Sequence, residues 1–338
     1  MVKLDMNVDK VLRRSIIRQV CAAVGLIALG GKSQIWAQSN YPNRPIKIIV
    51  PFAAGSAGDI MTRLIEPVMT RRLGQQVVIE NRAGGSGIVG AQVIKNALPD
   101  GYNLVMGAVS SHSIGPAMRP TSLPYDAQRD FTLIGLATKS ATVVAVHPSI
   151  PVKTLPELIA YSKQQPKPMG YASSAIGSSN YLAGEMLRLR GANLVSVAYN
   201  NISQGITDVI AGHVPILIYT VALLPHIRDG RLKGISVVSE KRLSQLPDLS
   251  TTAEQGLPDL VANSWIGLFG PAKLPLAIRD FLSASMETAL KDPSIMAKLL
   301  DSGLEPSYLP PTEFEAFLAR DLRMWKDVVI RAGVKTED

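Results

Sequence analysis

Between residues 46 and 239, short apolar runs alternate with longer segments of helical pattern, and this alternation constrains the fold more than any other feature. Because strands joined by helices run in one direction, it predicts an α/β architecture of mostly parallel sheets flanked by helices. The runs are apolar throughout, as expected for strands buried on both faces. The predicted strands are residues 46–50, 76–80, 103–108, 133–138, 142–147, 169–173, 194–199, 215–219 and 234–239.

The last third of the chain, from Trp265 onward, has a nearly continuous helical pattern that prolines interrupt. We therefore predict helices without strands of their own, which must pack on a sheet formed earlier in the chain. On this interpretation the C-terminal segment returns to the first domain.

The N-terminus has the pattern of a secretory signal peptide over residues 1–37. A basic start precedes the apolar run of residues 20–31, and Ala37 offers a small residue for cleavage. The apolar run is shorter than the ~20 residues that span a bilayer, although an uncleaved membrane anchor remains the alternative. Removal of this segment takes six basic and two acidic residues, so the formal charge falls from +8 to +4.

This lower charge and the scarcity of aromatic residues argue against nucleic acid as a partner. The only cysteine, Cys21, lies within the predicted signal peptide. The mature chain would then have no disulfide, no thiolate nucleophile and no thiolate metal site. We expect a protein of the bacterial cell envelope.

Two loops of small residues follow predicted strands and precede predicted helices. One is AAGSAGD at 53–59 and the other is SAIGSSN at 174–180, and we expect Asp59 and Asn180 to cap the helices that follow. The first N–H groups of a helix have no internal partner, and its dipole favours negative charge. Facing each other, the loops would form an anion cradle from backbone. Each could instead be only a tight connection.

The titratable residues do not support catalysis or a cofactor. The glycines of 85–90 match a dinucleotide-binding pattern, but no acidic residue ends the next strand, so we interpret this loop as a close backbone approach. The four histidines lack metal-ligand spacing. We interpret Glu80-Asn81-Arg82 as a buried Glu–Arg pair that fixes the adjacent loop.

Several motifs together resemble the receptors of tripartite tricarboxylate transporters, the Bug-type family. They include VPFAAGSAGD, ENRAGGSGIVG, PDGY, MGYASSAIGSSNYLAGEML, PHIRDGRL and SWIGLFGPAKLP, and the resemblance covers essentially the whole mature chain. It implies a two-lobed periplasmic binding protein of type II-like fold, with a ligand cleft between the lobes. We expect lobe 1 over 42–142 plus 265–338 and lobe 2 over 143–264.

The resemblance also implies a function without catalysis or cofactor. A monomeric periplasmic receptor would bind a small organic carboxylate and deliver it to membrane transporter subunits. The expected ligand contacts are loop and strand-end residues: Phe52, Ala54, Gly55, Ser56, Asp59, Ser110, Ser111, His112, Ser174, Ser178, Ser179, Asn180, Asn201 and Tyr219. Asp59 is expected to cap its helix or order water, since its charge would repel a carboxylate.

Departures from the family pattern bear on the ligand. Ser56 replaces a glycine, and Tyr219 stands where some members carry an acid that meets a ligand amine. This replacement argues against an amino-acid ligand and favours an aromatic or aliphatic carboxylate. Two alternatives remain, namely a secreted hydrolase-like enzyme and a ligand-sensing protein on the same fold.

Overall fold

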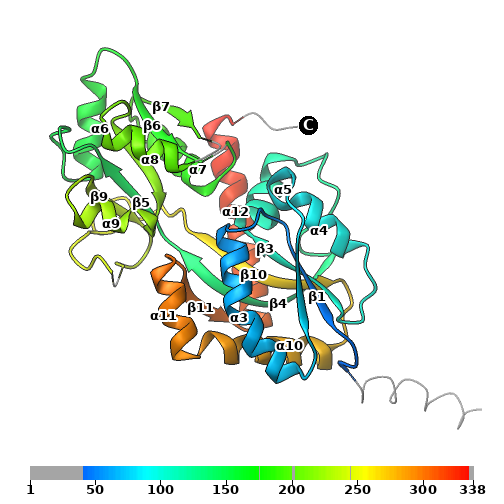
Figure 1. The fold of residues 1–338 in the computed structure, drawn as a ribbon. Helices are drawn as coiled ribbons and strands as arrows, with labels where there is room; N and C mark the ends of the chain where they lie inside the picture. Colours follow the sequence, from blue (N-terminus) through cyan, green and yellow to red (C-terminus); the bar gives the residue numbers. More distant parts are fainter. Residues whose placement is uncertain (1–40, 175, 200–201, 244, 335–338) are drawn as a thin grey trace, which may run out of the picture. The chain divides into compact units, whose positions relative to one another are not determined.

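The computed structural model describes residues 41–174, 176–199, 202–243 and 245–334, so the predicted signal peptide lies outside the described residues. Its strands form two sheets flanked by helices, which confirms the α/β class (Figure 1). The first sheet has the order β11-β4-β10-β3-β1-β2 and the second β7-β6-β8-β5-β9. The first contains β1 (Ile46–Val50), β2 (Val77–Asn81), β3 (Asn103–Ala108), β4 (Phe131–Ser140), β10 (Ser264–Pro271) and β11 (Glu305–Leu309). The second contains β5 (Thr142–Val146), β6 (Met169–Ser173), β7 (Leu194–Ala198), β8 (Ile216–Thr220) and β9 (Lys233–Val238).

Helices of different lengths connect and cover these strands. They are α3 (Ala57–Leu73), α4 (Ile88–Lys95), α5 (Gly115–Met118), α6 (Leu155–Lys163), α7 (Ser179–Leu189), α8 (Ile202–Ile210), α9 (Leu224–Arg228), α10 (Leu276–Leu290), α11 (Pro293–Asp301) and α12 (Pro311–Ala332). Single turns occur at η1 (Gly85–Gly87), η2 (Ser110–Ile114, a π-helical turn) and η3 (Val221–Leu223). None of the helices in the described ranges has both the length and the apolar composition needed to span a membrane.

The first long helix shows how the sequence sets these bounds. Ser56 is its N-cap, and Gly74 ends it in the left-handed conformation (φ 67°), which glycine adopts without strain. Met61, Ile65 and Met69 recur at helical spacing and are fully buried. Arg71 and Arg72 in the last turn complement the negative end of the helix dipole.

The two sheets are mixed, so the prediction of mostly parallel sheets is wrong. Strand β10 runs antiparallel to β3 and β4, and β5 runs antiparallel to β8 and β9. The reason is that the chain passes between the sheets twice. Strand β4 ends at Ser140 and β5 begins at Thr142, and β10 returns to the first sheet after β9.

The helical interpretation of the last third also missed β10 and β11. Strand β10 carries the apolar segment SWIGLFGP and inserts between β3 and β4, where its residues are almost all buried. Its sequence is a short apolar run bounded by serine and proline, which is typical of a buried strand. Helix α10 packs on β4 and α3.

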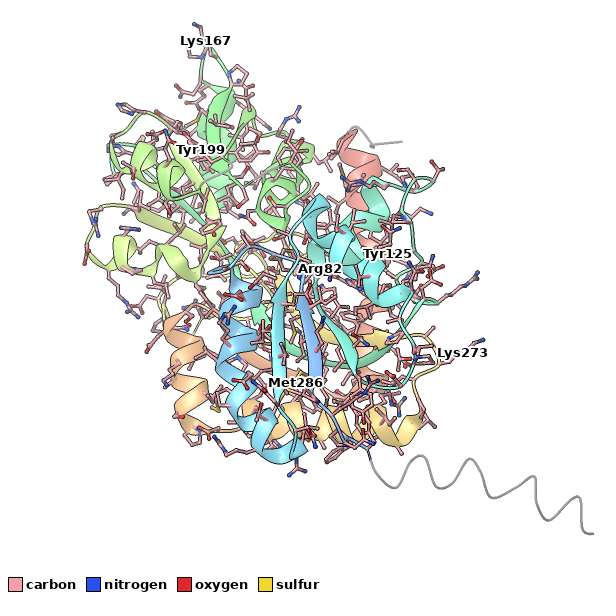
Figure 2. All side chains as sticks on the ribbon, turned by 45° about the vertical axis from the view of Figure 1, so that its right-hand side comes forward. Arg82, Tyr125, Lys167, Tyr199, Lys273 and Met286 are labelled. Carbon is pink, nitrogen blue, oxygen red and sulfur yellow. The ribbon has the colours of Figure 1, made fainter. Side chains whose placement is uncertain are left out.

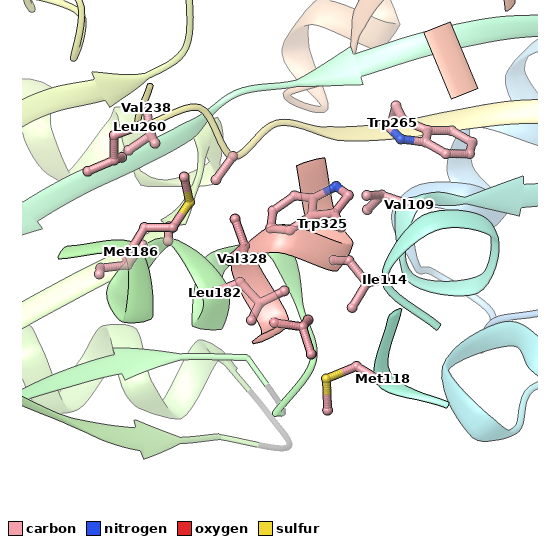
Figure 3. Close-up of a cluster of buried hydrophobic side chains, with 14 of the residues drawn as sticks. Val109, Ile114, Met118, Leu182, Met186, Val238, Leu260, Trp265, Trp325 and Val328 are labelled. Carbon is pink, nitrogen blue, oxygen red and sulfur yellow. The ribbon is translucent and has the colours of Figure 1, made fainter. Parts of the chain in front are cut away.

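Helix α12 joins apolar side chains from several elements into one core (Figure 3). Trp325 is fully buried, and it lies with Val328 between Ile114 and the α7 residue Leu182. The same helix is fixed to β10, because Trp265 Nε1 donates a hydrogen bond of 2.7 Å to Asp321 Oδ2. Burial raises the pKa of the Asp321 carboxyl above its usual range.

We predict that Trp325→Ala lowers the free energy of unfolding by about 3–5 kcal/mol, because it removes a fully buried indole and leaves a cavity. Ile330→Ala on the same helix is the control, since that side chain is 66% exposed. Urea unfolding of the two variants measures the difference. A loss at Trp325 no larger than that at Ile330 would show that this core is not structurally important.

Candidate functional site

A pocket of about 210 Å³ lies at the first turns of α3 and α7. Its volume is below the 300–1,000 Å³ common for drug-sized ligands, which suits a small ligand. The lining consists of Phe52, Ser56, Ala57, Gly58, Ala108, Val109, Ser110, Ser178, Ser179, Asn180, Ser264 and Ile266. None of these residues has a charged side chain, so polarity comes from hydroxyl, amide and peptide groups.

Serine residues cap both helices at this pocket. Ser56 Oγ accepts a hydrogen bond from the Asp59 N–H at 3.4 Å, and Ser178 Oγ accepts one from the Tyr181 N–H at 3.2 Å. Both serines have extended backbone, as an N-cap requires. The prediction that Asp59 and Asn180 are the caps is therefore wrong. Each helix begins earlier, because a serine placed there can reach the third helical N–H.

The first turns of these helices present peptide N–H groups to the pocket. Ala57 and Gly58 are the first two residues of α3, and Ser179 and Asn180 are the first two of α7. Their N–H groups precede the first intrahelical hydrogen bond. Within the described part of the chain, no hydrogen bond uses any of the four. Two helix starts therefore contribute residues with unused donors to the lining of one pocket, where the helix dipoles also favour negative charge.

Asp59 supports the first loop from behind the pocket. Its side chain is 3% exposed, and its carboxylate accepts hydrogen bonds from Arg63 Nε (3.0 Å), the Gly55 N–H (2.9 Å) and Asn81 Nδ2 (2.9 Å). Burial alone would raise its pKa, but these hydrogen bonds hold the pKa of Asp59 below its usual value. Asp59 thus remains ionised and fixes the turn; it does not line the pocket.

The neighbouring Glu80–Arg82 pair differs from the sequence interpretation. Arg82, labelled in Figure 2, forms an ion pair with Glu80, but their side chains are 44% and 31% exposed, so the pair is not buried. Asn81 between them fixes the loop instead, because its Nδ2 also donates to the Phe52 carbonyl at 3.1 Å.

The glycine-rich turn at 85–90 is a close backbone approach, as the sequence predicted. Gly87 has φ 99°, and a Cβ there would lie 3.0 Å from Ser111 and 3.1 Å from Phe52. A Cβ on Gly90 would lie 2.6 Å from Pro51. These glycines allow the turn at 85–87 and the start of α4 to pack directly against Pro51 and Phe52, and Phe52 lines the pocket.

Of the residues that follow β3, some line the pocket and others lie in the core. Ser110 lines the pocket, whereas Ser111 and His112 are fully buried and do not reach it. His112 stacks on Phe269 with ring centroids 4.1 Å apart, and its Nδ1 lies 2.9 Å from Ser111 Oγ. Burial lowers the pKa of His112 to about 3, so the imidazole is neutral at physiological pH. Its role in this structure is packing.

The remaining predicted contacts lie around the pocket in different ways. Ala54 and Gly55 are exposed on the first loop and do not line it, and Ser174 Oγ accepts a hydrogen bond of 2.9 Å from Asn180 Nδ2. Tyr219 lines an adjacent pocket of about 80 Å³. Asn201 lies outside the described residues.

The adjacent pocket continues from the first one, since Ala57, Ser264 and Ile266 line both. Its wall contains further hydroxyl groups, from Thr138, Ser140, Tyr219, Thr220 and Ser302. Thr138 Oγ1 is buried and has no hydrogen-bond partner among the described residues. The sequence interpretation missed Ser264 and Ile266, because it assigned no strand to 264–271. The apolar run between Ser264 and Pro271 is the feature of the sequence that could have identified this strand.

Within the described ranges, no group of three or more His, Cys, Asp or Glu side chains is placed to hold a metal ion.

Comparison with known proteins gives consistent matches over most of the chain. The family model described as "Tripartite tricarboxylate transporter family receptor" matches residues 61–334. The chain is 30% identical over 321 residues to Protein BugT of Bordetella pertussis, which covers 94% of this chain and 98% of BugT.

Two solved structures with similar folds contain bound acids. An R. palustris protein with adipate is 28% identical with a TM-score of 0.75, covering 87% of this chain and 98% of that one. MatC from Rhodopseudomonas palustris with bound malate is 28% identical with a TM-score of 0.72, covering 86% and 100%.

We predict that the buried neutral His112 makes stability pH-dependent. The unfolded imidazole takes up a proton near pH 6.5, whereas the native one resists protonation down to about pH 3. Lowering the pH from 7 to 5 therefore favours the unfolded state, by about 2 kcal/mol from this residue. His112→Phe removes that contribution. Urea unfolding at the two pH values should show a smaller loss in the variant, and equal losses would contradict the assignment.

Proposed function

The chain belongs to the receptor family of tripartite tricarboxylate transporters, as its sequence motifs predicted. From this premise we propose that it is a periplasmic receptor that binds a small organic carboxylate and delivers it to membrane transporter subunits. The relatives with adipate and malate support a carboxylate as the ligand class. The pattern of a signal peptide over residues 1–37 supports export.

One observation carries the proposal: the first turns of α3 and α7, whose N–H groups have no partner within their helices, line one pocket. A carboxylate is an acceptor with two oxygens and several lone pairs, so it can take hydrogen bonds from donors on both sides. Hydrogen bonds to an ionised acceptor are the strong ones. The pocket needs no arginine or lysine for this, because peptide dipoles supply the complementary field.

The two capping serines add donors to the same site. Each Oγ accepts a hydrogen bond from its own helix and keeps a hydroxyl proton. We expect these protons to be donated to the carboxylate, so that capping and ligand binding use the same two residues. Ser110 supplies a third hydroxyl.

The walls of the pocket indicate the chemistry of the ligand beyond its carboxylate group. Phe52, Val109 and Ile266 offer apolar surface for a short hydrocarbon body. The adjacent hydroxyl-lined pocket, with Tyr219 and the unpartnered Thr138, would take a second polar end. No acidic side chain lines either pocket, so nothing there would hold an ammonium group. We therefore favour an aliphatic dicarboxylate or a hydroxy acid over an amino acid.

A bound ligand would contact both the part of the molecule built on the first sheet and the part built on the second. Strand β1 of the first sheet leads into α3, and β6 of the second leads into α7. We propose that residues 42–142 with 265–338 and residues 143–264 act as two lobes. A carboxylate bonded to both helix starts would favour the arrangement in which the lobes are closed on it.

We predict that Ser178→Asp abolishes most of the binding without unfolding the protein. Aspartate is as good an N-cap as serine, so stability should change by no more than about 0.5 kcal/mol. The new carboxylate would stand where the ligand carboxylate binds, and affinity should fall at least about ten-fold. The measurement is ligand-dependent thermal stabilisation with adipate and with malate, which grows with concentration as RT ln(1 + [L]/Kd).

Thr154→Asp is the matched control, because Thr154 caps α6 in the same way and lines neither pocket. Thr154→Asp should bind adipate and malate with the same affinity as the unchanged protein. If adipate, malate and other mono-, di- and tricarboxylates all fail to stabilise the unchanged protein, the proposed function is wrong. If Ser178→Asp binds as tightly as Thr154→Asp, the function stands and the assignment of the pocket fails.

A further inference from the structure

A second and larger hollow, of about 620 Å³, lies between α12 and the segment after α5. It is distinct from the ligand pocket, with which it shares no residue. Tyr125, labelled in Figure 2, is one of its lining residues. The others are Lys95, Pro116, Ala117, Arg119, Pro120, Leu123, Pro124, Asp126, Ala127, Gln128, Ala319, Leu322, Arg323 and Lys326.

The hollow combines an apolar lining with positive charge. Its apolar side chains include Leu123 and Leu322, and several prolines and alanines. Four cationic side chains line it, from Lys95, Arg119, Arg323 and Lys326, against the single acid Asp126. The imbalance favours a negatively charged occupant.

Two of the cations are available for such an occupant. Arg323 and Lys326 lie one turn apart on α12 and are exposed, and neither forms an ion pair with another residue of the described chain. Lys95 is held in place, because its Nζ lies 3.1 Å from the Asp130 carboxylate and 2.7 Å from the Pro124 carbonyl.

The polar groups inside the hollow favour a protein segment over a small molecule. Lys95 and the Tyr125 hydroxyl already have partners within the protein, and no unpartnered buried polar atom of the described residues belongs to this lining. The groups that remain to recognise an occupant are the apolar surface of the hollow and the exposed cations at its edge. Protein–protein contacts have this arrangement of an apolar centre and a polar rim.

The wall of the hollow is bonded to the segment that reaches the ligand pocket. The Tyr125 hydroxyl donates a hydrogen bond of 2.6 Å to the Ser111 carbonyl. Ser110, the preceding residue, lines the ligand pocket, as do Ala108 and Val109. A partner seated in the hollow would therefore contact Tyr125, which is hydrogen-bonded to the segment that lines the ligand pocket.

We propose that this hollow docks an acidic segment with apolar side chains, carried by the membrane partner that receives the ligand. The identity of that partner rests on the proposed function, whereas the chemistry of the docked segment rests on the hollow alone. The acidic side chains would meet Arg323 and Lys326, and the apolar ones would enter between Leu123 and Leu322.

The test uses a fluorescein-labelled peptide of alternating glutamate and leucine as the probe, with fluorescence polarisation as the readout. Ala319→Trp fills the hollow without changing its charge, and Arg323→Glu with Lys326→Glu reverses its charge. Either change should weaken peptide binding about ten-fold or more. A peptide with glycine in place of leucine should bind the unchanged protein more weakly.

Two control variants match these changes. Ala316→Trp places the same side chain at an exposed position of α12 outside the hollow, and Lys153→Glu with Lys167→Glu makes the same change in charge elsewhere. Both should bind the peptide within about two-fold of the unchanged protein. Ligand-dependent thermal stabilisation by carboxylates should be the same in all four variants.

The proposal is overturned if the peptide does not bind. It is also overturned if Ala319→Trp binds like Ala316→Trp, or if the two charge reversals act equally, since both results indicate unspecific attraction. The peptide assay contains no small-molecule acid and is read by polarisation, so its failure is separate from a failure of the proposed function, which thermal stabilisation by small carboxylates reports.

Discussion

The proposed ligand site depends on peptide N–H groups that lack an intrahelical partner. The first two residues of α3 and of α7 supply four of them, and all four residues line the same pocket. A pocket without a charged side chain would ordinarily suit a neutral ligand, but two helix dipoles converging on it favour an anion. On the proposed function, specificity for an acid would therefore come mainly from the backbone.

Such donors are useful only if the turns that present them are fixed. In the first loop, ionised Asp59 is held by Arg63 and Asn81 and in turn binds the Gly55 N–H. Behind the Ser110 segment, a neutral His112 packs among aromatic rings. Helix α12 then joins these elements to α7 through one apolar core. Buried groups that do not line the pocket thus keep its donors in place.

The sequence predicted some of these features and missed others for physical reasons. Apolar runs bounded by turns marked β1, β3 and β6 to the residue, because strands buried on both faces have a continuous apolar pattern. Strand β10 was missed because its glycine-containing apolar run precedes a long segment of helical sequence pattern. Its partners β3 and β4 are also distant in sequence. The small loops indicated an anion site, but Asp59 and Asn180 were chosen as caps over Ser56 and Ser178, since sequence alone does not fix where a helix begins. The sequence also did not reveal which side chains are buried, because His112, predicted as a ligand contact, lies in the core.

Whether two helix starts bind one carboxylate can be seen in a crystal structure of the protein with a bound acid. The acid would be the carboxylate that stabilises the protein most strongly. We expect its carboxylate oxygens about 3 Å from peptide nitrogens of both first turns, among Ala57, Gly58, Ser179 and Asn180. An acid bound elsewhere, or held in this pocket by side chains alone with the four N–H groups facing water, would contradict it.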